Sequence, residues 1–347
     1  MSNNLSWIVP AESDAKKSIS ELKNFLKRFL KKSEKIGFQT SGTTGTPKKI
    51  YFSYKQIEKA AEYSILATQV HELSGDFLCP LPAVSVAAKM LAVRAYLLGR
   101  HVYVLKPQLN PNIPTILSQK FAQVSFSPAQ VMNIWANEPK LFLSIYENLT
   151  QIILGGSPVP FTLEQKLQSL KNNIYISYGM TETLSHVAFR RPGDLVYKAL
   201  HEDILFSVDT NKKLSVKTPW TIKCVKTNDA AELIDFRQFV WLGRMDFIIN
   251  SGGVKLHPEE LEKKLQPFMP ADIHWFIGPL KDPMFGERPV LFLEGLKIPA
   301  NIKKILMKAF PQSLERPQNV ILVDKFQYSL EGKFLRRKTL EYINNYS

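Results

Sequence analysis

The sequence predicts an α/β fold with a large N-terminal domain and a small C-terminal α+β domain. Three observations predict it. From residue 36 onward, short apolar runs alternate with helical stretches, which is typical of a largely parallel sheet covered by helices. After residue 195 the apolar runs are separated by polar turn residues, which is typical of antiparallel strands. The length of 347 residues suits two domains.

The large domain is expected to begin with an amphipathic helix at 18–32, because its apolar residues fall on one stripe. A strand at 36–39 leads into a Gly/Thr-rich loop. Ser53 and Gln56 then form a capping box for a helix that runs to about residue 71. The further expected strands are 76–81, 101–105, 123–126, 151–154 and 174–177, and the further expected helices are 84–98 and 162–170.

An antiparallel β subdomain is expected next, with strands at 205–208, 214–217, 221–225 and 239–242. The small α+β domain follows, with a helix from Pro258, strands at 274–277, 290–293 and 320–323, and a helix at 302–310. We expect the large domain to cover 1–243 and the small domain to cover 247–347. A hinge at 244–246 is expected between them.

Charge and cysteine content limit the classes of function that the sequence allows. Lysine and arginine number 45 against 31 acids, a net charge of +14, which suits nucleotides or nucleic acid. No interleaved basic and aromatic patch or known motif supports nucleic acid, so small-molecule polyanions are favoured. Two cysteines, Cys79 and Cys224, exclude a disulfide framework, and no Cys/His cluster has zinc spacing. No signal peptide or stable membrane insertion is expected, and a cytoplasmic location follows.

The most specific motif is the string Thr40-Ser41-Gly42-Thr43-Thr44-Gly45-Thr46-Pro47-Lys48. Its glycines allow close backbone approach to a ligand, its hydroxyls are donors, and Lys48 adds a cation. These features indicate a polyphosphate-binding loop. The spacing is not that of a Walker A loop.

The second motif is Tyr178-Gly179-Met180-Thr181-Glu182-Thr183, which follows an expected strand. Open α/β sheets bind ligands beyond the carboxyl ends of their strands. A carboxylate that faces a phosphate loop suits Mg²⁺, which takes one or two carboxylates plus substrate phosphates. The alternative is a Thr/Glu pair that only caps a helix.

Two further motifs lie toward the C-terminus. Asp229 and Arg244, with Asp246 close behind, offer partners for ribose hydroxyls and phosphate oxygens. The double glycine Gly252-Gly253 precedes the helix at Pro258. Gly332-Lys333 places a mobile cation at a loop tip, where the alternative is an ordinary solvated lysine.

These four motifs, in this order over residues 36–340, resemble the adenylate-forming (AMP-binding) superfamily of acyl-CoA ligases, and within it the o-succinylbenzoate–CoA ligases of menaquinone biosynthesis. The resemblance implies an acetyl-CoA synthetase-like fold. It also implies that ATP and Mg²⁺ convert a carboxylate into an acyl-adenylate with release of pyrophosphate, and that the acyl group then passes to CoA.

The resemblance implies a nucleotide site made of Thr40, Ser41, Gly42, Thr43, Thr44, Gly45, Thr46, Lys48, Gly155, Gly156, Ser157, Tyr178, Gly179, Met180, Asp229 and Arg244. Gly155, Gly156 and Ser157 look like the stretch that packs on one side of adenine, and Tyr178 like the residue that stacks on the other. Asp229 and Arg244 resemble the ribose-binding pair.

The resemblance also implies catalytic roles. Thr181 contacts the α-phosphate, Glu182 binds the magnesium, and Lys333 bridges the carboxylate and the α-phosphate during adenylation. Asp246 occupies the hinge position, and Gly252, Gly253 and Lys255 lie where the family binds CoA.

The acid site is expected around residues 81–94, which look like the acyl-pocket region of the o-succinylbenzoate ligases. That substrate keeps one carboxylate that is not activated, and a buried carboxylate needs a cation. Arg94 is the first candidate and Lys89 the second, although both also suit the surface of an amphipathic helix. Ser85 and His186 are further candidates, and the alternatives for His186 are the thiol channel or a hydrogen-bonded polar residue under the β subdomain. The alternatives are another aromatic or dicarboxylic acid, or an inactive nucleotide-binding homologue.

Some features depart from the family. Few residues precede the phosphate loop, so the expected N-terminal subdomain is shortened, and its exposed flank is a candidate homodimer interface. The family's Pro-Leu-Phe-His is here Pro82-Ala83-Val84-Ser85, and its Thr-Gly-Asp is Thr227-Asn228-Asp229. The usual Pro and Thr before Gly332-Lys333 are absent.

Overall fold

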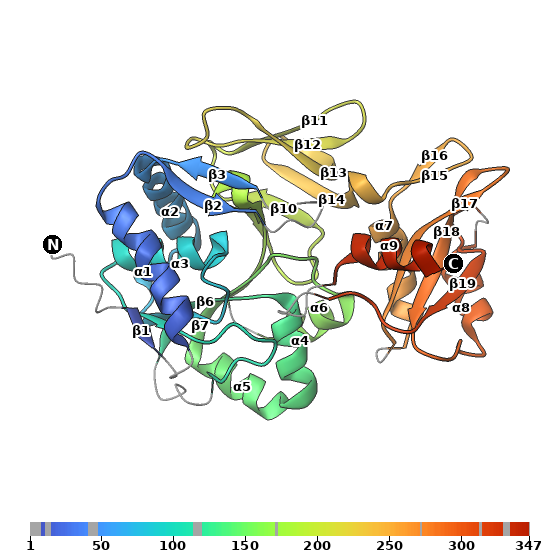
Figure 1. Ribbon diagram of the computed structural model, residues 1–347, viewed down its shortest axis with the longest axis horizontal. Helices are drawn as coiled ribbons and strands as arrows, with labels where there is room; N and C mark the ends of the chain where they lie inside the picture. Colours follow the sequence, from blue (N-terminus) through green and yellow to red (C-terminus); the bar gives the residue numbers. More distant parts are fainter. Residues whose placement is uncertain are drawn as a thin grey trace. The chain divides into compact units, whose positions relative to one another are not determined.

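The computed structural model describes residues 8–10, 15–40, 48–113, 120–170, 173–270, 273–311, 314–328 and 334–346 (Figure 1). The described residues form two compact units. The first unit extends to Leu205 and includes Val216–Val225. The second unit contains Phe206–Ser215 and the described residues from Lys226 onward. The division expected at residues 244–246 stays a prediction.

The first unit is built on a sheet with the strand order β1-β5-β4-β6-β7-β8-β9-β10. The pairs from β1 to β8 are all parallel, and β9 and β10 pair antiparallel. These strands are β1 (Ile8–Pro10), β4 (Asp76–Cys79), β5 (Val102–Val104), β6 (Phe121–Phe126), β7 (Leu149–Leu154), β8 (Asn173–Met180), β9 (Ser185–Arg190) and β10 (Val196–Ala199). The predicted, largely parallel α/β sheet is confirmed. Homodimer formation stays a prediction.

Helices of the first unit form two groups, seen in Figure 1 as α1–α3 in blue to cyan and α4–α6 in green. They are α1 (Lys16–Leu30), α2 (Tyr54–Thr68), α3 (Val86–Leu97), α4 (Pro128–Asn137), α5 (Pro139–Asn148) and α6 (Phe161–Gln168), with 3₁₀ turns at Val70–Glu72 and Thr181–Thr183. Val131, Phe142 and Leu163 of the second group share a core with the sheet residues Val124 and Ile152. The buried side chains of α3 face the sheet from the first group, with contacts to β4, β6 and β9.

A separate hairpin carries the phosphate-loop motif. Its strands are β2 (Ile36–Gln39) and β3 (Lys49–Phe52), which pair antiparallel. The strand at 36–39 was predicted at these bounds, whereas β3 was not predicted. The capping box of Ser53 and Gln56 at the start of α2 is confirmed.

The antiparallel strands that follow have the order β14-β13-β12-β11. They are β11 (Leu205–Val208), β12 (Lys213–Lys217), β13 (Val225–Asp235) and β14 (Gln238–Arg244). The strand predicted at 221–225 is wrong. Thr221 closes a turn there by donating its backbone N–H to the hydroxyl oxygen of Thr218 at 3.2 Å, and the strand begins only at Val225.

The C-terminal part of the second unit is the predicted α+β assembly. Its sheet has the order β16-β15-β18-β17, and β19 pairs with β18. The elements are a 3₁₀ turn at Met245–Phe247, β15 (Ile249–Ser251), β16 (Val254–Leu256), α7 (Pro258–Leu265), a 3₁₀ turn at Gln266–Phe268, β17 (Trp275–Asp282), β18 (Gly286–Glu294), α8 (Ile302–Ala309), β19 (Asn319–Val323) and α9 (Arg336–Tyr346). Side chains of α7 and α8 share one core with Ile277 and Leu291, and α9 packs with Phe276 and Phe292 in another.

No helix in the described ranges is both long and apolar enough to cross a lipid bilayer.

Candidate active site

The phosphate-loop motif lies between β2 and β3 in the sequence, and the structure describes its first and last residues. Thr40 donates its backbone N–H to the carbonyl oxygen of Lys48 at 2.9 Å, and Lys48 returns its N–H to the Thr40 hydroxyl at 3.0 Å. These two bonds close the base of the loop and bring its first and last residues together. The predicted ligands between them, Ser41, Gly42, Thr43, Thr44, Gly45 and Thr46, lie outside the described residues, as does the predicted catalytic Lys333.

The second motif forms the corner between β8 and β9. Gly179 pairs with His186 across this hairpin, and a Cβ at Gly179 would overlap the carbonyl oxygen of Ser185. Leu184 and Ser185 both adopt positive φ, 53° and 83°, a conformation that costs non-glycine residues free energy. The Thr183 hydroxyl stabilises the corner by donating to the Ser185 carbonyl oxygen at 2.8 Å and accepting from the Met180 N–H at 3.1 Å.

Thr181 and Glu182 occupy the turn after β8. Thr181 is buried and Glu182 half-buried. In the described part of the chain, neither side chain has a hydrogen-bond or ion-pair partner. This contrasts with Thr183, whose hydroxyl is fully used. One free carboxylate at the end of a parallel strand is a donor set that fits Mg²⁺ together with phosphate oxygens.

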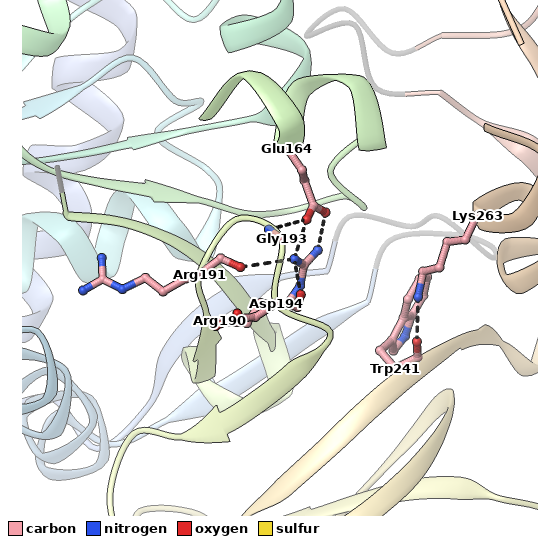
Figure 2. A network of polar contacts seen from close by, with 7 residues as sticks. All are labelled: Glu164, Arg190, Arg191, Gly193, Asp194, Trp241 and Lys263. Carbon is pink, nitrogen blue, oxygen red and sulfur yellow. Dashed lines mark hydrogen bonds and ion pairs between the residues drawn. The ribbon is translucent and has the colours of Figure 1, made fainter. Parts of the chain in front are cut away.

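The predicted adenine-stacking residue Tyr178 belongs to a chain of aromatic and charged contacts. Its ring lies edge-on to Tyr197, with centroids 5.8 Å apart, and the Arg190 guanidinium lies 5.2 Å from the Tyr197 ring. Figure 2 shows that Glu164 of α6 binds Arg190 at 2.7 Å and accepts from the Gly193 N–H at 3.1 Å. Ion pairing with Glu164 raises the pKa of Arg190 despite its burial.

Gly155 and Gly156 directly follow β7, and Ser157 comes next. Gly155 donates its N–H to the Phe126 carbonyl oxygen at 3.2 Å, and a Cβ there would overlap the Ser177 hydroxyl. The predicted adenine-binding stretch therefore begins beside the strand that ends in Tyr178.

Arg94 is the largest fully buried side chain among the described residues, with 1% of its surface exposed. Its Nε donates to the side-chain oxygen of Gln123 at 3.0 Å. No carboxylate among the described residues pairs with it, and its two terminal nitrogens have no protein acceptor there. Burial lowers the pKa of Arg94 to about 9, so the group stays charged at neutral pH. The nearby Cys79 thiol does not neutralise it, because burial raises the thiol pKa to about 11.

His186, which belongs to β9, lies close to Arg94 of α3. Burial, reinforced by the Arg94 charge, holds the pKa of His186 well below its usual 6.5, so the ring is neutral. Its Nε2 lies 2.6 Å from the hydroxyl of Ser64 on α2. The structure therefore brings two predicted acid-site residues together and adds Ser64, which sequence reasoning missed.

Sequence reasoning also missed Gln123 and Gln151. Gln123 donates to the side-chain oxygen of Gln151, and Gln151 donates to the carbonyl oxygen of Thr68 at 2.8 Å. The signal in the sequence was one glutamine inside each of two apolar strand runs.

Lys89 and Ser85 make other contacts. The Lys89 ammonium donates to the Gly37 carbonyl oxygen at 3.4 Å and lies 4.9 Å from the centre of the Phe38 ring. Lys89 and Arg94 are five residues apart on α3, which at about 3.6 residues per turn puts them on different faces. Ser85 is the N-cap of α3, and its hydroxyl accepts the Ala88 N–H at 3.2 Å. Arg94 is therefore the better placed of the two predicted cations.

The predicted ribose-binding pair lies in the second unit. Asp229 on β13 and Arg244 on β14 are register partners, with a charged contact of 3.6 Å. Arg244 also binds Asp246 at 2.9 Å, and Asp246 is further held by Asn228 and, at 3.7 Å, by Arg337 of α9. The predicted hinge residue is thus tied to both neighbouring strands and to the last helix of its own unit.

Glu259 on α7 packs against Gly243, directly before this cluster. Gly243 has φ of 150°, and a Cβ there would overlap the Glu259 carboxylate. Glu259 Oε2 is buried with no hydrogen-bond partner in the described ranges. Burial raises the pKa of Glu259 to about 7, and the Arg336 charge only partly opposes this effect.

The predicted CoA segment is the turn between β15 and β16. Gly252 donates its N–H to the Phe285 carbonyl oxygen at 2.9 Å, and Gly253 follows it at φ of 83°. Lys255 donates to the Asn211 side chain at 2.9 Å. Figure 2 shows a second lysine contact in this unit, in which Lys263 of α7 donates to the Trp241 carbonyl oxygen at 3.2 Å. That bond fastens α7 to β14.

Known proteins resemble this chain in sequence. The chain is 27% identical over 332 residues to the 2-succinylbenzoate–CoA ligase of Lactococcus lactis, covering 88% of this chain and 71% of that protein. It is 23% identical over 325 residues to the enzyme of the same name from Listeria monocytogenes, covering 87% and 68%.

Solved structures share the fold. An acyl-CoA synthetase (AMP-forming)/AMP-acid ligase II-like protein from Dyadobacter fermentans matches with a TM-score of 0.60 and 26% identity, over 94% of each chain. The o-succinylbenzoate coenzyme A synthetase of Bacillus subtilis, solved with ATP and magnesium, matches with a TM-score of 0.70 and 19% identity, over 88% of this chain and 69% of that one. The predicted acetyl-CoA synthetase-like fold is confirmed.

The family model described as AMP-binding enzyme matches residues 38–217. That range holds the phosphate-loop motif, the helix α3 that carries the predicted acid-site residue Arg94, and the β8–β9 corner. The resemblance drawn from the four motifs is confirmed, and the chain belongs to the family of AMP-binding enzymes.

Proposed function

We propose that this chain is an ATP-dependent acyl-CoA ligase that activates o-succinylbenzoate. In the first step a substrate carboxylate oxygen attacks the α-phosphorus of ATP, and the bond to pyrophosphate breaks. In the second step the CoA thiol loses its proton and attacks the acyl carbonyl, which releases AMP. Names of the similar proteins and the family support the reaction class.

The observation that carries the choice of acid is Arg94. A fully buried guanidinium without a carboxylate partner in the described chain leaves a positive charge uncompensated, which is costly unless an anion binds beside it. O-succinylbenzoate brings a second carboxylate that is not activated. The neutral ring of His186 adds a polar group nearby without a competing charge.

The roles of Thr181 and Glu182 rest on side chains that have no hydrogen-bond or ion-pair partner among the described residues. Thr181 would donate to the α-phosphate, and Glu182 would hold Mg²⁺. The metal would neutralise charge on the phosphates as the pyrophosphate leaves. Tyr178 would stack on adenine, and its ring is braced by Tyr197 and Arg190.

The small domain supplies the remaining roles. We assign Lys333 to the bridge between the attacking carboxylate and the α-phosphate, because negative groups meet there in the transition state. Rotation about Asp246 would withdraw that lysine and bring the Gly252-Gly253 turn to the thiol. The domain boundary at 243–247 is part of the same proposal.

A coupled assay tests the function. The protein is incubated with o-succinylbenzoate, ATP, Mg²⁺ and CoA, and pyrophosphate, AMP and the thioester are measured together. Equal amounts of all three are expected. Turnover with another aromatic or dicarboxylic acid but not with o-succinylbenzoate would correct the substrate. Nucleotide binding without pyrophosphate release for any acid would make the chain an inactive homologue.

A further inference from the structure

Two glutamines lie buried in the middle of the parallel sheet. Gln123 on β6 is 0% exposed and Gln151 on β7 is 1% exposed, and the two are register partners. Central strands of such sheets are normally apolar throughout. A buried amide costs free energy unless it is hydrogen-bonded. These amides are bonded to each other and to groups on two helices, so they form one connected system.

The direction of that system is determined at one end. The Thr68 carbonyl oxygen can only accept, so the Gln151 amide must present its NH₂ group there, at 2.8 Å. The Gln151 oxygen then accepts from the Gln123 NH₂ group. This leaves the Gln123 oxygen to accept from Arg94 Nε at 3.0 Å. Both amides are therefore oriented, and the last acceptor in the chain faces the guanidinium.

Thr68 is the last residue of α2. Its carbonyl is one of the four at a helix end that lack an intrahelical partner, where the helix dipole is negative. The glutamine chain thus connects the negative end of α2 to the buried cation on α3. It uses only Arg94 Nε, so the two terminal nitrogens remain for a ligand.

We propose that Gln123 is a positioning residue that holds the Arg94 guanidinium ready for the second carboxylate of the acid and so sets the preference for a diacid over a monoacid. This inference rests on the proposed ligase function. Gln123 does not touch the reacting atoms. It acts on substrate choice through Arg94, and Gln151 supports it from the next strand.

Gln130 provides a matched control. It is also a glutamine, 1% exposed, in the same unit, and its NH₂ group donates to the carbonyl oxygens of Pro80 and Gln108 at 3.0 Å each. It has no bond to Arg94, Gln123 or Gln151 among the described contacts. A purely structural role for buried glutamines would therefore give the same result at Gln123 and Gln130.

The first experiment compares Gln123→Met and Gln130→Met with wild type. The kcat/KM for pyrophosphate release is measured with o-succinylbenzoate and with benzoylpropionate, the analogue that lacks the ring carboxylate. Gln123→Met is expected to lower the ratio of the two values about tenfold, mainly through KM for the diacid, because the oriented charge-assisted bond is lost. Gln130→Met is expected to keep the wild-type ratio. An unchanged ratio in Gln123→Met, or an equal drop in both variants, overturns the proposal.

A second variant tests the sign of the effect. Gln123→Glu places a carboxylate beside Arg94 and supplies internally the charge that the diacid would bring. The diacid preference is expected to fall below that of Gln123→Met. A preserved preference in this variant contradicts the proposal. If Gln123→Met does not fold, Gln151→Met breaks the chain one link further from Arg94 and is expected to lower the ratio by a smaller factor.

The third measurement does not depend on activity. Protein labelled with ¹⁵N-arginine is examined by NMR for a slowly exchanging Nε–H signal that Arg94→Lys removes. That signal is expected to persist in Gln130→Met and to exchange at least about tenfold faster in Gln123→Met, since a hydrogen bond protects the proton. Unchanged exchange rejects the glutamine chain. If the wild-type protein has no ligase activity with any acid, the proposed function is rejected instead. The two failures are therefore distinguishable.

Discussion

Arg94 in the first unit and Glu259 in the second are both buried ionisable groups, but they differ in whether burial removes their charge near neutral pH. Glu259 has its pKa raised to about 7, so it can take up a proton and become neutral near physiological pH. Arg94 keeps a pKa of about 9 and stays charged, and among the described residues it donates to an amide oxygen and lies near the neutral Cys79 and His186. A proton can relieve the first burial. The charge of Arg94 is not compensated by a carboxylate of the described residues, which supports the proposed binding of an acid beside it.

The largest effect is expected when the buried cation of Arg94 is removed. Arg94→Met removes the cation, and kcat/KM for o-succinylbenzoate is expected to fall about 100-fold, because a buried charge-assisted contact is lost. The value for benzoylpropionate is expected to change less than about threefold. Pyrophosphate release with each acid measures both values.

Arg100→Met is the control for this substitution. Arg100 binds the backbone carbonyl oxygens of Val70, His71 and Gly75 and has no part in the proposed acid site. It is expected to lower stability and to leave the ratio of the two acids intact. Equal losses for both acids in Arg94→Met would show that Arg94 does not recognise the second carboxylate.

Glu259→Gln tests whether the buried carboxylate of the second unit titrates. The folded pKa of about 7 lies above the ordinary value of 4.5, so the folded state retains a proton that the unfolded chain loses between these values. The free energy of unfolding of wild type should therefore fall as pH rises from about 4.5 to 7. A neutral glutamine does not titrate, so this loss is absent from the variant. Between pH 5 and pH 8 the free energy of unfolding of Glu259→Gln is expected to rise by about 1–3 kcal/mol relative to that of wild type.

Urea unfolding at the two pH values measures this difference. The exposed Glu232 on β13 serves as the control, and Glu232→Gln is expected to leave the pH dependence as in wild type. A Glu259→Gln protein whose stability followed pH like wild type would mean that the buried carboxylate does not titrate.

Asp229→Asn tests the proposed ribose-binding pair of the second unit. Arg244 there has two carboxylate partners, so its charge is compensated, unlike that of Arg94. Loss of one carboxylate is expected to raise KM for ATP about tenfold by removing an acceptor for ribose hydroxyls. The ratio of diacid to monoacid should not move. A change in that ratio would place Asp229 in acid selection and not in ATP binding.

Ser64→Ala gives the smallest expected change. It removes the 2.6 Å contact to His186 Nε2 and leaves the Arg94 charge in place. KM for the diacid is expected to rise about threefold, as for one neutral hydrogen bond. The ¹⁵N shifts of the His186 ring are expected to report a change of tautomer. Ser169→Ala, at an exposed helix end, should change neither quantity.

Much of the fold was predictable because its signals are local. The strands at 36–39 and 205–208 were predicted at their observed bounds, and the capping box at Ser53 is present. One strand was predicted wrongly and a neighbouring one was missed, also for local reasons. Thr221–Val225 alternates like a strand, yet Thr218 and Thr221 form a turn and Ile222 is 92% exposed. The true strand, β13, contains acids and asparagine, which are rare in strands.

The candidate site was predictable only where a motif carries it. Asp229 and Arg244 were assigned to one ligand and are register partners across β13 and β14, and Arg94 and His186 are close together. The exact acid, the hinge and the role of Lys333 stay predictions. Sequence reasoning missed Gln123, Gln151 and Ser64 because they do not form a motif with a fixed spacing in the sequence. Only the parallel register and the end of α2 bring them together.

The last turn of α2 therefore has a consequence for altering this enzyme. Ser64 contacts His186, and the Thr68 carbonyl oxygen accepts from the glutamine chain that leads to Arg94, so two residues one turn apart on one helix support two sides of the proposed acid site. A library that varies positions 64–68 would shift both sides while the residues in contact with the acid keep their identity. New substrate preferences could be selected there before any contact residue is changed.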